Sequence, residues 1–167
     1  MSKSKPNSVA AEEQLASFIA KFTPEIAAEA EAVLGKMRAR YPSALELVYD
    51  NYNALAIGFS PTERASEAIF SIAVFPRWVS LFFLQARGLS DPDKILKGNG
   101  SVARHVVLKP VETLDDPRLL RLMEEAAGTA KVPLVAGGEH RLVIKSVSAK
   151  QRPRRPIAAA QKAKATA

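Results

Sequence analysis

Five residues, spread over three stretches of the chain, have side chains suited to lining a small-ligand pocket. They are Tyr49, Asn51, Trp78, Arg104 and His105. Arg104 can attract an anion beside the turn at residues 98–100, which lacks the spacing and the lysine of a phosphate loop. Arg104 and His105 are consecutive, so in one strand they point to opposite faces, and only one of them can enter a given pocket. Each residue also has a purely structural explanation. Arg104 can extend its charged end to water, His105 can form hydrogen bonds within the sheet, and Trp78 can pack against its neighbours.

Carboxylate pairs offer a second kind of chemistry, the binding of a hard metal ion such as iron. Asp91 and Asp93 are the pair that we select as the metal site. Other candidate ligands are Glu25 with Glu29, Asp115 with Asp116, and His105. Helix capping and the helix dipole explain these acids as well as metal binding does. The candidate acids are also spread along the chain, without the dense acidic ridge that would favour an iron site.

Catalytic motifs are harder to find. The chain has no cysteine and only two histidines, so cysteine-based metal sites are excluded, and no His-Glu-x-x-His pattern occurs. Neither histidine lies in a recognisable nucleophile motif. We therefore expect a non-enzymatic domain that binds a small ligand or a metal ion, with an enzyme of unknown reaction as an alternative.

The basic residues favour a further alternative, association with nucleic acid. The net charge is +7, and the stretch from residue 145 to the end carries seven cations and no acid. The residues that we expect to contact phosphates are Lys150, Arg152, Arg154 and Arg155. A solubilising terminus without a partner explains the same pattern. Residues 6–144 hold 15 basic against 17 acidic residues, so the excess charge belongs to the two ends.

The elements that position these residues follow from the periodicity of the apolar side chains. Helices are predicted over residues 9–22, 23–41, 91–98 and 116–128. Thr23-Pro24 and Asp116-Pro117 both combine an N-cap with a proline at the first helical position. Strands are predicted over residues 45–50, 55–59, 69–75, 78–84, 103–108 and 140–145. The short connections between the first four strands favour an antiparallel meander, and the last strand is placed at an edge.

Several segments together resemble the YdhG-like domain of unknown function. They are Val48 to Leu55, Trp78 to Leu84, Asp91-Pro92, Leu96 to Gly100 and Arg104-His105, in this order within residues 19–127. The resemblance implies an α+β fold, comparable to the frataxin-like architecture, with a mainly antiparallel sheet of five or six strands and flanking helices. One branch of this family is described as a frataxin-like iron chaperone, so the resemblance also implies iron as a cargo. Kinship of fold does not transfer function.

Length and composition predict one domain, over residues 9–145. A flexible N-terminus, residues 1–8, precedes it, and a basic, disordered tail, residues 146–167, follows it. The chain has no apolar signal-peptide core and no apolar stretch of about 18 residues, so we expect a cytoplasmic protein without a membrane partner.

Overall fold

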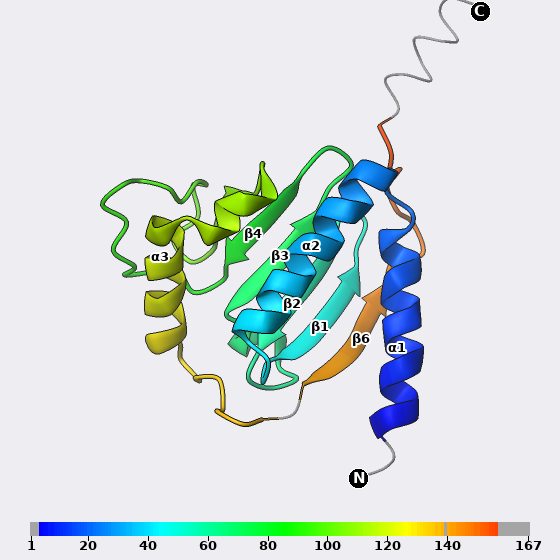
Figure 1. Cartoon of the computed structure of the whole chain (residues 1–167), viewed down its shortest axis with the longest axis horizontal. Coiled ribbons are helices and arrows are strands. Elements are labelled where there is room, and N and C mark those ends of the chain that lie inside the picture. The colour runs from blue at the N-terminus through cyan, green and yellow to red at the C-terminus, as the bar shows by residue number, and fades with distance from the viewer. Residues whose placement is uncertain (1–3, 139, 157–167) are drawn as a thin grey trace, which may run out of the picture.

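The computed structural model describes residues 4–138 and 140–156 and has an α+β fold, as predicted (Figure 1). Its six strands form a single mixed sheet in the order β5-β4-β3-β2-β1-β6. The strands are β1 (Leu45–Asp50), β2 (Leu55–Ser60), β3 (Phe70–Val74), β4 (Val79–Phe83), β5 (Arg104–Val107) and β6 (Arg141–Val147). Strands β1 to β4 form the predicted antiparallel meander, β5 pairs antiparallel with β4, and β6 pairs in parallel with β1 at the edge.

Three α-helices accompany the sheet in the described part of the chain. They are α1 (Ser4–Ile19), α2 (Pro24–Arg40) and α3 (Pro117–Gly128), with short 3-10 helices η1 (Ala65–Glu67) and η2 (Val111–Asp115). Both predicted N-caps are confirmed. Thr23 accepts a hydrogen bond from the Ile26 amide at 3.3 Å, and Asp116 accepts one from the Arg118 amide at 2.9 Å. Helix α1 begins earlier than predicted, and none of these helices is long and apolar enough to cross a membrane.

Helices α1 and α2 cover one face of the sheet, and α3 lies beside its β4 and β5 side (Figure 1). The core is formed by alternate residues of β2, β3 and β4 that face the helices, such as Ile57, Ile72 and Leu81. The register places Glu46 and Asp50 of β1 on this same buried face, and both are 0% exposed. Buried carboxylates need charged or hydrogen-bonding partners, so these two positions organise much of the polar structure.

The helix predicted over residues 91–98 is wrong. The Asp91 carboxylate accepts from the amides of Ile95 and Leu96, both at 2.9 Å, and closes a turn instead of capping a helix. Lys94 adopts a positive φ of 53°, which a right-handed helix does not allow. Lys97 then exchanges backbone hydrogen bonds with His105 and extends the edge of the sheet beside β5.

The predicted end of the domain at residue 145 falls inside β6, and contacts with the domain continue beyond it. The Ser148 amide donates to the Asp50 carbonyl at 2.9 Å, and the Arg152 amide donates to the Tyr52 carbonyl at 2.8 Å. Residues 148–156, which we call the C-terminal segment, therefore lie against the connection between β1 and β2. The remainder of the predicted tail, residues 157–167, and residues 1–3 lie outside the described ranges.

Candidate functional site

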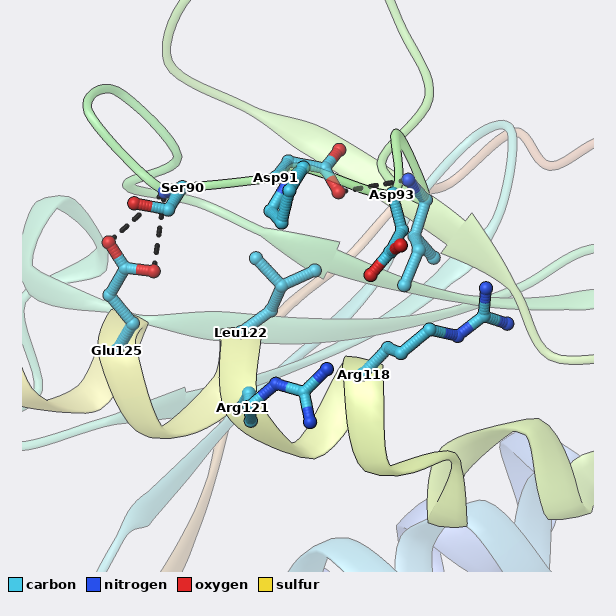
Figure 2. Close-up of a pocket in the computed structure, with 9 residues that line it drawn as sticks. Ser90, Asp91, Asp93, Arg118, Arg121, Leu122 and Glu125 are labelled. Carbon is cyan, nitrogen blue, oxygen red and sulfur yellow. Dashed lines mark hydrogen bonds between the residues drawn. The ribbon is translucent and has the colours of Figure 1, made fainter.

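A cleft of about 180 Å³ lies between α3 and the loop that follows residue 88. Figure 2 shows Leu122 and Glu125 pointing from α3 toward this loop, with Arg118 and Arg121 on the same helix. The Ser90 amide donates to both oxygens of Glu125, at 3.2 and 3.1 Å, and ties the loop to the helix. The buried Leu122 provides an apolar floor between charged walls.

The two arginines of this cleft differ in their partners. Arg118 pairs with Asp116 at 2.8 Å. This hydrogen bond lowers the pKa of Asp116 to about 2 and raises that of Arg118. Arg121 forms neither an ion pair nor a side-chain hydrogen bond with any residue that the structure describes, and it is exposed. Its guanidinium is therefore available to an anionic ligand, which it can bind through two parallel hydrogen bonds.

Both residues of the predicted metal site, Asp91 and Asp93, line this cleft. Asp91 already uses both carboxylate oxygens to bind backbone amides, and this leaves Asp93 as the more available ligand. Within the described ranges, no group of three or more histidine or acidic side chains is arranged to hold a metal ion. A hard cation prefers six or more oxygen or nitrogen ligands, so these two carboxylates would need many water ligands to complete a site.

Arg104 lines a neighbouring cavity of about 220 Å³, together with Arg87 and Leu96. Asp91 belongs to the walls of both cavities, so the two spaces adjoin at this residue. The Arg104 Nε donates to the Gly100 carbonyl at 3.1 Å, which confirms that this arginine lies beside the predicted glycine turn. Asp91 therefore lies between the two cavities. Arg118 and Arg121 line the first, and Arg87 and Arg104 line the second.

The five predicted pocket residues do not come together. Arg104 and His105 lie on opposite faces of β5, as predicted, because Arg104 is opposite Phe83 on the helix side and His105 stacks on Phe82 at 5.0 Å on the other. Tyr49 shares the face of His105, but β2, β3 and β4 lie between them. A strand spacing of about 4.8 Å puts their strands about 19 Å apart.

Trp78 and Asn51 lie at a different place again, in the connections at one end of the sheet. Trp78 is 38% exposed and stacks on Phe75 with ring centroids 4.8 Å apart. The Asn51 carbonyl accepts a hydrogen bond from Arg154. Tyr49 has a buried hydroxyl without a hydrogen-bond partner in the described chain, and burial raises its pKa.

Arg154 is set apart from the other predicted phosphate-binding residues because it is buried, at 6% exposure. Its Nη2 donates to Asp50 Oδ1 at 2.8 Å, and Lys21 Nζ donates to Asp50 Oδ2 at the same distance. Burial acts to raise the pKa of Asp50, but hydrogen bonds from Lys21, Gln151 and Arg154 outweigh it and hold the pKa below its ordinary value. Arg154 therefore anchors the C-terminal segment, while Lys150, Arg152 and Arg155 remain exposed.

A second buried carboxylate cluster, centred on Glu46, was not predicted. Arg38 of α2 binds both oxygens of Glu46 at 2.7 Å, and its Nη2 also reaches Glu12 of α1 at 2.6 Å. His140 Nε2 lies 2.7 Å from Glu46 Oε2. Burial acts to raise the pKa of Glu46, but His140 and Arg38 lower it overall. In the sequence, Glu46 and Asp50 each lie two residues from Val48, so all three share one face of a strand. The sequence does not indicate which residues pair with the two carboxylates.

Comparisons with family models, curated proteins and solved structures find no match. The function must therefore be argued from the cleft, the cavities and the charged surfaces themselves.

Proposed function

We propose that the protein is a YdhG-like, non-enzymatic binding domain whose ligand is a small anionic molecule, held in the cleft between α3 and the loop after residue 88. The α+β architecture with a mainly antiparallel sheet supports the family assignment. The observation that carries the binding site is Arg121, an exposed arginine at the wall of a cleft, without a partner of its own among the described residues.

The size of the cleft supports a small ligand. Drug-sized ligands occupy pockets of roughly 300–1,000 Å³, whereas this cleft measures about 180 Å³. An arginine at one wall suits a carboxylate or phosphate group. Asp93 at another wall suits a hydroxyl or an ammonium group on the same molecule. Amino acids, hydroxy acids and sugar phosphates have this combination of groups.

Arg121→Gln tests the proposal, with Arg64→Gln as the control. Arg64 is exposed and belongs to the loop between β2 and β3, outside the residues that line the cleft. A panel of amino acids, hydroxy acids and sugar phosphates is added to the full chain, and the melting temperature is measured. A ligand at 100 times its Kd adds about 2.7 kcal/mol of stability, which raises the Tm of a domain of this size by about 5–10 °C.

We expect at least one compound to raise the Tm in the wild type and in Arg64→Gln, and to bind at least 10-fold more weakly to Arg121→Gln. A panel without effect, or an effect that survives Arg121→Gln, contradicts the proposal. Ferrous iron, added anaerobically and followed by calorimetry, tests the cargo that the family resemblance implies. Saturable binding that Asp93→Asn abolishes and Arg121→Gln preserves would make the cleft a metal site.

A further inference from the structure

We propose that the end of the sheet beside the C-terminal segment binds single-stranded nucleic acid. This surface, which we call the basic end, combines the connections at residues 51–54 and 75–78 with residues 148–156. The pairing of Leu55 with Val74 puts the two connections next to each other, and Asp50 pairs with Val147 where β6 leads into the C-terminal segment. Figure 1 shows the β1–β2 connection, the β3–β4 connection and the last described residues at the same end of the molecule.

Four exposed cations come from two separate parts of the chain to the basic end. They are Arg77, Lys150, Arg152 and Arg155. None of them forms an ion pair within the ranges that the structure covers. Of the acids here, Asp50 is buried and neutralised by Lys21 and Arg154, and the exposed Glu25 in the first turn of α2 is outnumbered. The surface is therefore positive, which suits a phosphate backbone.

Two exposed aromatic rings belong to the same connections, Tyr52 to residues 51–54 and Trp78 to residues 75–78. Tyr52 is 50% exposed and Trp78 is 38% exposed. The Arg152 guanidinium lies over the Tyr52 ring, 5.9 Å from its centroid. Aromatic rings beside cations are the combination that single-stranded nucleic acids require, because unpaired bases stack on the rings while the backbone follows the charges. The rings are the reason to favour nucleic acid over an anionic membrane, for which the charges alone would suffice.

The anchoring of the segment makes this surface a preformed one. The buried Arg154 binds Asp50, and the Arg152 amide is fixed to the Tyr52 carbonyl, so the exposed side chains on either side of Arg154 are held on the folded domain. Arg155 is fixed in a similar way, because its Nε donates to the Lys21 carbonyl at 3.2 Å. A preformed surface loses less conformational freedom on binding than a disordered tail does.

The test is fluorescence polarisation of the full chain with a labelled 20-nucleotide oligo(dT) between 50 and 200 mM KCl. Log affinity falls with log salt, and each phosphate contact adds about 0.7 to the magnitude of this slope for single strands. Arg152→Gln/Arg155→Gln should reduce the magnitude of the slope by about 1.4. The matched control is Arg64→Gln/Lys131→Gln, which removes the same charge from residues outside the basic end and should leave the slope unchanged. Tyr52→Leu should weaken binding at least 5-fold without changing the slope.

Three results would overturn the proposal. The control pair could lower the slope as much as the test pair, which would mean diffuse attraction to net charge. Duplex DNA of equal charge could bind as tightly as the single strand, which would mean that no base stacks. Tyr52→Leu could bind like the wild type while vesicles with anionic lipids bind more tightly than the oligonucleotide, which would make the basic end a membrane contact.

Discussion

The Arg154→Ala variant should be much less stable to unfolding than the Arg155→Ala variant. The substitution removes one of the two cations that neutralise Asp50, whose side chain is 0% exposed. Breaking a buried ion pair from one side costs about 3–5 kcal/mol. Lys21 keeps its 2.8 Å contact with Asp50, so we expect the lower end of this range, about 3 kcal/mol. For a domain of this size that is a Tm lower by about 6–12 °C.

Urea denaturation followed by circular dichroism measures this difference. Arg155→Ala is the control, because Arg155 is exposed and surface substitutions change stability by about 0.5 kcal/mol or less. The double variant Asp50→Asn/Arg154→Ala should recover part of the loss, since no uncompensated buried charge remains. An Arg154→Ala protein within about 0.5 kcal/mol of the wild type would refute the assignment of Arg154 as the anchor.

Three further predictions concern other groups. Glu46→Gln should cost about 2–3 kcal/mol at neutral pH, through its bonds to Arg38 and His140. Because the folded pKa of Glu46 lies below its ordinary value of 4.5, its contribution is present above pH 4.5 and lost as the pH falls through the folded pKa, so Glu46→Gln should have a flatter acid limb of stability. Burial raises the pKa of Tyr41 to about 12 and also raises that of Tyr49, so an ultraviolet titration should show these two tyrosines ionising late, and stability should fall as the pH rises from 10 toward 12. Gly98→Ala should cost about 1–3 kcal/mol in urea denaturation, because φ is 110° at this residue.

The meander could be predicted from the sequence because its signals are local. Alternating apolar residues and short polar connections specify β1 to β4 and their antiparallel neighbours locally, whereas the pairing of β5 with β4 spans the long connection over residues 84–103. The caps Thr23 and Asp116 are local in the same way. The helix predicted at Asp91-Pro92 was wrong for a different reason. An aspartate that accepts hydrogen bonds from amides a few residues later can start a helix or close a turn, and the rest of the fold determines which occurs.

The site was harder to predict because it depends on distances between elements. A sequence shows that Tyr49 and His105 belong to strands, but not that three strands lie between them. Buried charges are the clearest case. The carboxylates of Glu46 and Asp50 are both 0% exposed, and their partners come from α2, the chain before α2, the loop before β6 and the C-terminal segment. Only the fold brings these partners together.

The anchor and the proposed nucleic-acid surface can be separated by experiment although they share one segment. Arg154 is buried, so its substitution acts on binding only by releasing Arg152 from its place over Tyr52 and Arg155 from its place at the Lys21 carbonyl. Arg154→Ala should therefore weaken oligo(dT) affinity while it also lowers stability. Arg152→Gln should weaken affinity and leave the free energy of unfolding within about 0.5 kcal/mol of the wild type. If Arg154→Ala lowered stability and bound oligo(dT) with unchanged affinity, the cations would act as a loose tail, and the preformed surface would be wrong even though the anchor was right.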